Sequence, residues 1–179
     1  MSKVIRFFSK MRFWTDASCC YSHSSWSFCR LSNGMLVGDT SEWESWQPNG
    51  VRHNRFIGDG HTPGTRVDLF ELVSPIPTKK ISGGIIFLQG QIGKKYDWGG
   101  ILGVFLRRNE HSEGRWFCSE FVDAFLKVCD VHLFNFVESY QVVPGLIPSS
   151  PIVRYVGYII TGEKLEEGFI VHDPQGESK

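Results

Sequence analysis

Arg115-Trp-Phe-Cys-Ser-Glu-Phe-Val-Asp-Ala-Phe-Leu-Lys-Val-Cys129 is the stretch that decides the fold, and from Cys118 onward it has the pattern of an amphipathic helix. Apolar side chains recur at helical spacing and predict one buried stripe: Cys118, Phe121, Val122, Phe125, Leu126 and Cys129. Most of the polar residues between them fall off this stripe. The acidic residues come early and Lys127 comes late, which suits the helix dipole.

Cys118 is expected in the first turn of this helix, where unpaired backbone N–H groups and the dipole favour negative charge. A thiol in such a place can have its pKa lowered and act as a thiolate nucleophile. The alternative interpretation is that Cys118 is the first apolar residue of a core helix, because free cysteine is among the most buried residue types. The stretch alone leaves both interpretations open.

Length and composition limit the class of protein. The chain has 179 residues, which suits one domain, and 41% of them are hydrophobic, enough for a sizeable core. Basic and acidic residues both number 19, so the net charge is zero and nothing draws the chain as a whole toward nucleic acid or anionic lipid. We therefore expect no nucleic-acid partner.

The cysteine pattern argues against a disulfide framework and against a structural zinc site. The count of five is odd and no Cys-x-x-Cys pair is present. We expect no metal and no cofactor. The first residues lack the apolar core of a signal peptide, and no stretch is long enough to span a membrane. These features favour a cytoplasmic protein with reduced thiols.

The first part of the chain predicts antiparallel strands. Expected strands cover residues 4–8, 21–29, 35–38, 51–57 and 67–73, with turns at residues 15–18 and 32–34 and a polar, tryptophan-rich loop at residues 40–49. In that loop, Trp43 and Trp46 are expected either to serve a protein interface or to pack locally over the sheet.

The second part changes period. Residues 79–93 and 118–129 predict helices, residues 101–106 one or two helical turns, and residues 107–114 a charged loop. A proline-punctuated connector then leads to a last strand at residues 152–161. Strands followed by helices predict an α+β fold with a segregated antiparallel sheet, comprising residues 1–161, and residues 162–179 are expected to be a charged, frayed tail.

A thiol nucleophile needs a base and a group that orients the base. Among the six histidines, His23 opens a predicted strand, whereas His53, His61, His111 and His172 lie in polar, loop-like or terminal context. His132 follows the cysteine-bearing helix and is expected as a partner of its C-terminus. Asp39, just past the neighbouring strand, is the first candidate to orient His23, and Glu42 is the reserve candidate.

Two blocks carry a family resemblance: Tyr96-Asp-Trp-Gly-Gly100 and Cys118-Ser-Glu-Phe-Val122. Together they resemble the Tyr-x-Trp-Gly-Gly and Cys-Ser-Gly-Leu/Phe-Val signature of the NlpC/P60 papain-like cysteine hydrolases. The Ser-His unit at His23 precedes the cysteine, which is similar to the circularly permuted, phage-encoded branch of that superfamily. Gly50-Val-Arg52 matches a further segment of that branch, so the resemblance spans residues 12–130.

The resemblance implies a permuted papain-like fold, with an antiparallel sheet packed against the helix that bears the nucleophile and against accessory helices. It implies Cys118 as nucleophile and His23 as general base, with Asp39 as third member and the backbone N–H of Cys118 as an oxyanion donor. Tyr96 would line the cleft, and Trp98 and Glu120 are the further substrate-binding candidates. The implied substrate is a peptide, amide or acyl group.

Two positions depart from the signature. Phe117 replaces the usual Asp before the nucleophile, and Glu120 replaces the usual Gly after Cys-Ser. In peptidoglycan-cleaving members that Asp helps to hold the amine end of a stem peptide, so the substitution argues against peptidoglycan specificity. The alternative function is a structural or interaction protein, for instance a virion or tail component with other virion proteins as partners, that keeps the fold without catalysis.

Overall fold

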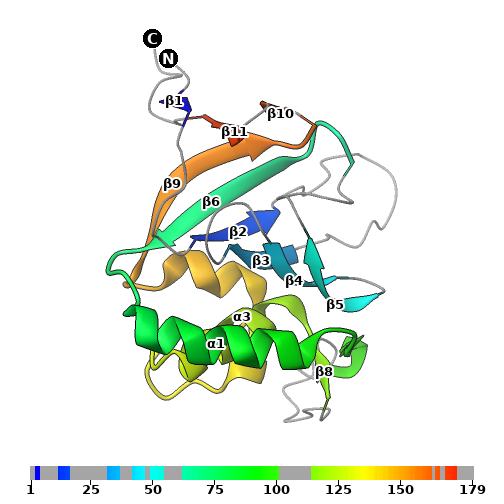
Figure 1. The fold of residues 1–179 in the computed structure, drawn as a ribbon, viewed down its shortest axis with the longest axis vertical. Helices are drawn as coiled ribbons and strands as arrows, with labels where there is room; N and C mark the ends of the chain where they lie inside the picture. The colour runs from blue at the N-terminus through cyan, green and yellow to red at the C-terminus, as the bar shows by residue number, and fades with distance from the viewer. Residues whose placement is uncertain are drawn as a thin grey trace.

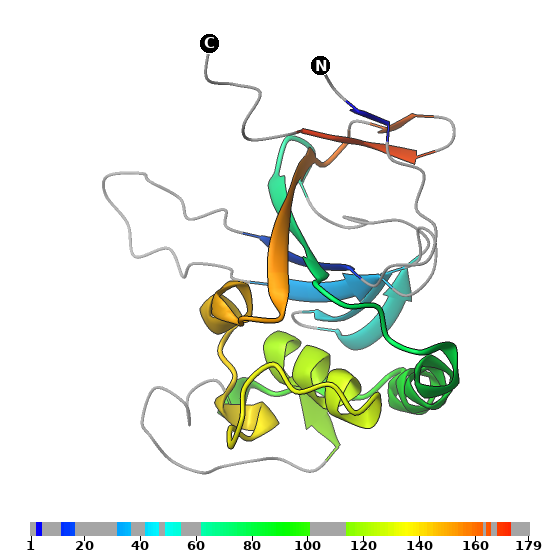
Figure 2. The same ribbon diagram turned by 90° about the vertical axis from the view of Figure 1, so that its left-hand side faces the viewer.

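A computed structural model shows an α+β fold in which one antiparallel sheet lies over a layer of helices (Figures 1 and 2). The structure describes residues 3–4, 12–16, 32–36, 42–46, 49–54, 62–100, 114–162, 164–165 and 168–172. The α+β class is the one that the order of strand and helix patterns predicts.

The main sheet has six strands in the order β5-β4-β3-β2-β6-β9, and each pairing is antiparallel. The strands are β2 (Arg12–Asp16), β3 (Ser32–Leu36), β4 (Glu42–Trp46), β5 (Gly50–Asn54), β6 (Arg66–Leu72) and β9 (Val153–Ile160). Strand β9, which follows the helices in the sequence, pairs with β6 at the edge of this sheet.

The strands β5, β6 and β9 confirm the strands predicted at residues 51–57, 67–73 and 152–161, but three predicted turns or loops are wrong. Residues 42–46 of the expected loop form β4, residues 32–34 of the expected turn belong to β3, and Thr15 and Asp16 belong to β2. The glutamates of β4 led to the prediction of a loop, because charged side chains are rarely buried in a strand. Here Glu42 and Glu44 are buried and hydrogen-bonded to the neighbouring strand β5, whose side chains Arg52 and Asn54 supply the donors.

The pairing of β6 with β9 contains a bulge. The register shifts between Leu69 and Phe70, which oppose Gly157 and Tyr155, so Val156 is the extra residue on β9. The strict alternation predicted for residues 152–161 breaks there, and Tyr158 and Ile159 are both buried although they are consecutive.

Within the described residues, two longer α-helices and two short 3-10 helices cover one face of the sheet. They are α1 (Thr78–Gln91), α3 (Cys118–Val128), η1 (Ser139–Gln141) and η2 (Pro144–Ser149). Phe121 and Phe125 of α3 are fully buried and share a core with Leu88 of α1 and Trp43 of β4. Each such aromatic side chain contributes about 1.5–3 kcal/mol by leaving water.

Helix α3 is buried on its polar side as well, which corrects the expectation that its polar residues lie away from the core. Ser119, Glu120 and Asp123 are all at most 1% exposed. The connector that follows α3 folds back over this side, where Ser139 donates a hydrogen bond of 2.7 Å to Asp123, and Lys127 lies 3.1 Å from the same carboxylate. Burial of the Asp123 carboxylate is tolerated because Ser139 and Lys127 replace water around it.

The C-terminal segment is not the frayed tail that the sequence predicts, at least as far as residue 172. Strands β10 (Lys164–Leu165) and β11 (Gly168–Val171) pair with each other, and β11 pairs with β1 (Lys3–Val4) near the two termini (Figure 2). His172 also forms an isolated bridge with Tyr158 of β9, and the two rings stack at 4.9 Å. The described residues of strands β10 and β11, and His172, are therefore paired with other strands.

Candidate functional site

Cys118 is the first residue of α3, as the sequence predicts. Phe117 before it is extended, with φ −93° and ψ 164°, so the chain enters the helix from a strand-like segment. Cys118 is a free cysteine and only 1% exposed. The thiol thus stands at the N-terminal end of a buried helix, beside backbone N–H groups that have no partner within the helix.

The two blocks that carry the family resemblance lie side by side. Strand β7 (Lys95–Tyr96) pairs in parallel with β8 (Arg115–Trp116), so Tyr96 stands opposite Trp116, two residues before Cys118. The N–H of Asp97 donates to the carbonyl of Trp116 at 3.1 Å and continues this pairing toward the helix.

The Gly50-Val-Arg52 segment joins the same structure. The N–H of Val51 donates to the carbonyl of Lys94 at 2.8 Å, and the N–H of Gly93 donates to the carbonyl of Val51 at 3.0 Å. Gly50 has φ +87°, and any Cβ at this position would overlap the carbonyl of Lys94, so only glycine fits. Three segments far apart in the sequence therefore meet at the entrance to α3.

Strand β4 adds one more link. Its Ser45 hydroxyl, which is fully buried, donates a 2.7 Å hydrogen bond to the carbonyl of Trp116. That carbonyl therefore accepts from both Ser45 and Asp97, which fixes the strand leading into Cys118. Ser45 escaped the sequence reasoning because the stretch around it was interpreted as a loop.

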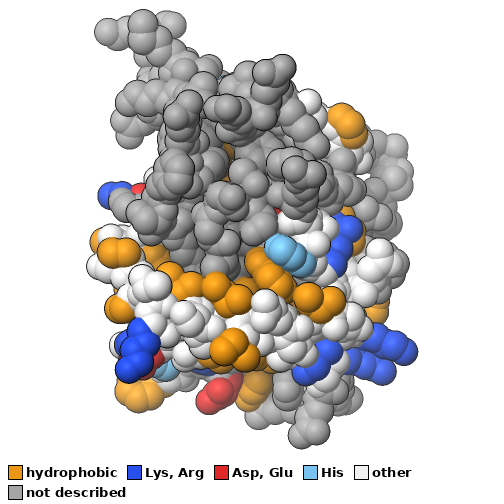
Figure 3. Space-filling model, in the orientation of Figure 1, with side chains coloured by type: hydrophobic (Ala, Val, Ile, Leu, Met, Phe, Trp, Pro, Cys, Tyr) orange, Lys and Arg blue, Asp and Glu red, His pale blue; other side chains and the backbone are white. Residues whose placement is uncertain are grey.

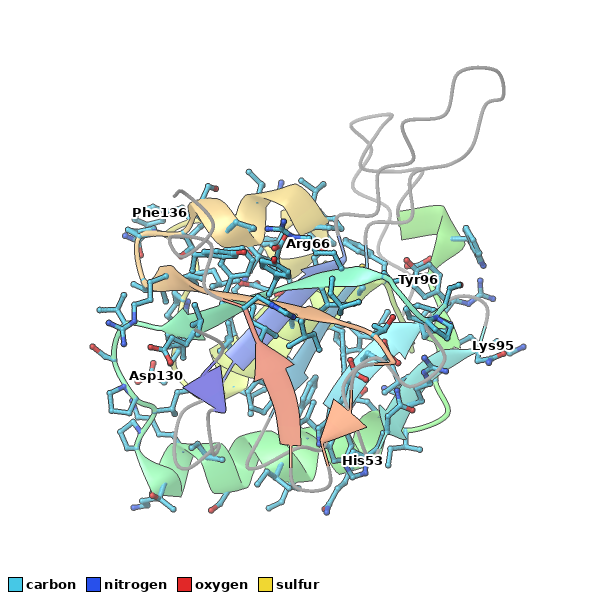
Figure 4. All side chains as sticks on the ribbon, turned by 90° about the horizontal axis from the view of Figure 1, so that it is seen from above. His53, Arg66, Lys95, Tyr96, Asp130 and Phe136 are labelled. Atoms are coloured by element: carbon cyan, nitrogen blue, oxygen red, sulfur yellow. The ribbon has the colours of Figure 1, made fainter. Side chains whose placement is uncertain are left out.

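Tyr96 and Trp98 form an aromatic pair beside this entrance. Their ring centroids lie 5.2 Å apart in an edge-to-face arrangement; Tyr96 is buried, whereas Trp98 is 54% exposed. Figure 4 places Tyr96 and Lys95 at the same margin of the molecule, with Lys95 pointing outward. Of the predicted substrate-binding residues, Trp98 is thus the one that offers a large exposed surface.

Glu120 turns back toward the start of its own helix. Its Oε2 accepts a hydrogen bond of 3.4 Å from the N–H of Phe117, and its side chain is 1% exposed. A glutamate three residues after the N-cap commonly caps a helix in this way. The geometry gives Glu120 a capping position, and its predicted contact with substrate stays a prediction.

Asp97 is a buried acid that the sequence reasoning did not single out. Its Oδ1 accepts a hydrogen bond of 2.9 Å from the N–H of Gly100 and caps the helical turn at residues 98–100. Within the described part of the chain its Oδ2 has no hydrogen-bond partner, and neither has the Ser119 hydroxyl. The signal that could have found Asp97 is its place within the Tyr-Asp-Trp-Gly-Gly block, where an Asp shortly before two glycines is typical of a turn.

The reserve candidate Glu42 lies on β4 next to a second buried acid. The amide of Asn54 donates to Glu42 at 3.2 Å and to Glu44 at 2.6 Å, and Arg52 forms an ion pair with Glu44 at 2.5 Å. This cluster ties β4 to β5 through the arginine of the Gly-Val-Arg segment. The cluster fixes Glu42 in the sheet. The predicted role of Glu42 beside a histidine stays a prediction.

His23 and Asp39 lie outside the described residues, so their predicted contact with Cys118 stays a prediction. Two other histidines, His53 and His172, belong to a strand and a bridge rather than to the predicted loop and tail, although His53 is exposed, as a solvated residue would be. His53 lies on β5 and stacks on Trp43 with centroids 4.1 Å apart, and its partial burial lowers its pKa; His172 stacks on Tyr158. His132 follows α3 as expected, but its ring lies 4.0 Å from Asp130 and is exposed.

Of the two roles expected for Trp43, the structure shows local packing. Trp43 is 6% exposed and belongs to the core, so it packs locally over the sheet. Trp46 is half-buried at the end of β4, where the Arg52 guanidinium lies 4.8 Å from its ring centroid.

Within the described ranges, no group of three or more His, Cys, Asp or Glu side chains is arranged to hold a metal ion. In the same part of the chain no helix has the length and apolar character needed to cross a membrane. No protein-family model matches the chain. No curated protein matches it either.

Proposed function

We propose that the protein is a cysteine hydrolase of the permuted NlpC/P60 type, with Cys118 as its nucleophile. The observation that carries the proposal is the meeting of three segments at the entrance to α3, since these are the segments on which the resemblance depends. They are Gly50–Arg52, Tyr96–Gly100 and the strand that ends in Cys118. A permuted papain-like fold is part of the same proposal.

In this proposal the reaction is acyl transfer. The Cys118 thiolate attacks the carbonyl carbon of an amide or ester, and the backbone N–H of Cys118 stabilises the oxyanion. His23, which takes the thiol proton, returns it to the leaving amine or alcohol, and water then releases the acyl group from sulfur. Asp39, or Glu42 in its place, orients the imidazole.

The substrate proposed is a peptide, amide or lipid-acyl group rather than a peptidoglycan stem peptide. Phe117, which stands where the signature has an acid, is 1% exposed, and its ring packs near Gly100. An apolar side chain buried in this way offers no charge to the amine end of a stem peptide.

A second candidate is a structural or interaction protein, such as a virion component, that keeps the site without using it. The burial of Cys118 to 1% exposure favours this candidate, because a substrate must reach the sulfur. In this candidate Cys118 is a core residue, and the exposed Trp98 is one side chain available to a partner.

Covalent trapping separates the two candidates. Wild-type protein and Cys118→Ala are incubated with peptide amides, cell-wall fragments and acyl esters, and intact-mass spectrometry records adducts. The hydrolase predicts an acyl adduct on the wild type, mapped to Cys118, and none on the variant. Equal masses for wild type and variant with every substrate would favour the structural candidate.

A further inference from the structure

Two basic side chains stand opposite each other on the short strands that lead to the candidate site. Lys95 of β7 and Arg115 of β8 are direct partners in the parallel pairing, and both are exposed. Residues at one register position of paired strands project to the same side of the sheet. Like charges placed opposite each other destabilise the pairing, so this arrangement needs an explanation.

No acid compensates this pair within the described part of the chain. Neither Lys95 nor Arg115 takes part in a salt bridge or side-chain hydrogen bond there, whereas Arg52, Arg66, Lys80, Lys127 and Arg154 all pair with acids. Lys94 adds a third cation nearby and lies 6.0 Å from the ring centroid of Trp116. In Figure 3 Lys and Arg side chains gather on the right, beyond the end of α1.

The pair lies close to the proposed nucleophile along the chain. Arg115 precedes Cys118 by an extended segment, which at the rise of a strand separates their Cα atoms by roughly 10 Å. Lys95 adjoins Tyr96, whose ring contacts the exposed Trp98. An extended ligand whose reactive carbonyl is at Cys118 therefore reaches the pair within two or three residues.

We infer that Lys95 and Arg115 form an anion-binding subsite that takes the carboxylate of an acidic peptide. The inference deepens the proposed function, and its description as a substrate subsite rests on that function. A guanidinium presents a planar fork of donors to a carboxylate, and an ammonium adds a point charge. A carboxylate placed between them also removes the repulsion within the pair.

A peptide fits this surface better than a nucleic acid does. Nucleic-acid affinity comes from neutralising many phosphates along a backbone, and the chain as a whole is neutral. One pair of cations suits one carboxylate.

The test measures binding without catalysis. The Cys118→Ala protein is titrated into a fluorescein-labelled tetrapeptide of glutamate, and into its glutamine counterpart, at low and at physiological salt, with fluorescence anisotropy as the readout. We expect at least about tenfold tighter binding of the glutamate peptide, weakened by salt. The double substitution Lys95→Gln with Arg115→Gln removes this preference.

Lys79→Gln is the matched control, because Lys79 is an equally exposed cation in the first turn of α1. It leaves the preference unchanged, and circular dichroism confirms that each variant is folded. A preference that survives the double substitution, or that Lys79→Gln removes equally, overturns the inference. Tighter binding of a labelled deoxythymidine decamer than of the glutamate peptide overturns the assignment to peptides. Because Cys118 is absent throughout, the binding result stands apart from the success or failure of acyl trapping.

Discussion

Cys118 and Cys129 mark the two ends of one helix: Cys118 is the first residue of α3, and Cys129 is its C-cap. Both are free and both are buried, at 1% and 0% exposure. Their electrostatic surroundings differ in sign, because the N-terminal end of a helix favours an anion and the C-terminal end disfavours it. Cys129 therefore serves as an internal control for Cys118, the candidate nucleophile.

The C-cap thiol predicts a pH dependence of stability. Burial raises the pKa of Cys129, with smaller opposing effects from a backbone hydrogen bond at Gly84 and the charge of Lys80. An unfolded chain therefore loses this proton at lower pH than the folded one does. The free energy of unfolding receives its full contribution below the unfolded pKa of about 8.5 and falls as pH rises above it.

Urea titrations between pH 7 and pH 10 check this prediction. Cys129→Ala should show a shallower fall in the free energy of unfolding with pH than the wild type does. Identical slopes for the two proteins would show that Cys129 is not the group responsible.

Gly50→Ala tests the contact between β5 and the segment before β7. The substitution places a Cβ against the carbonyl of Lys94 and also forces a non-glycine residue to φ +87°. We expect a loss of stability of about 3 kcal/mol or more, combining the left-handed conformation with overpacking. Thermal unfolding followed by circular dichroism measures it.

Gly64→Ala provides the control for Gly50, since Gly64 has φ +86° but nothing within 4 Å of its added Cβ. It should lose only the conformational part, about 1–2 kcal/mol. Equal losses at the two positions would mean that β5 does not press against Lys94 as described.

Gly84→Ala tests the crossing of α1 and α3. Its Cβ would lie 2.5 Å from the sulfur of Cys129 and 2.5 Å from a ring carbon of Phe125. The gain in helix propensity does not offset this overpacking, so we expect a net destabilisation of about 1–2 kcal/mol. The neighbouring Gly83→Ala meets nothing within 4 Å and should instead stabilise the helix by about 0.5–1 kcal/mol. Urea unfolding of both variants should therefore give changes of opposite sign.

The helices and several strands were predictable because their signals are local. The stripe from Cys118 to Cys129 reflects the packing of one helix face, which its helical period reveals, and runs of apolar residues mark β6 and β9. Strand β4 was missed because Glu42 and Glu44 read as polar loop residues, and only the donors of Arg52 and Asn54 across the sheet make their burial possible.

The candidate site was predictable in part. The resemblance singled out the segments around Gly50, Tyr96 and Cys118, and the structure brings these segments together. The hydrogen bonds that hold them, such as that from the Ser45 hydroxyl to the carbonyl of Trp116, join residues far apart in the sequence. Such contacts produce no periodic pattern of residue types from which they could be predicted. Lys95 and Arg115 stand opposite each other because of the register in which β7 pairs with β8, and that register cannot be predicted from composition.

The rate at which iodoacetamide labels each cysteine at pH 6, followed by peptide mass spectrometry, tests the central claim most directly. The access of iodoacetamide to the sulfur does not favour either thiol, because Cys118 and Cys129 are both almost completely buried. The account predicts labelling of Cys118 at least about tenfold faster than that of Cys129, because the helix N-terminus favours the reactive thiolate. It also predicts loss of that advantage in His23→Ala. Equal labelling rates for the two thiols in the wild type would contradict the assignment of Cys118 as a nucleophile.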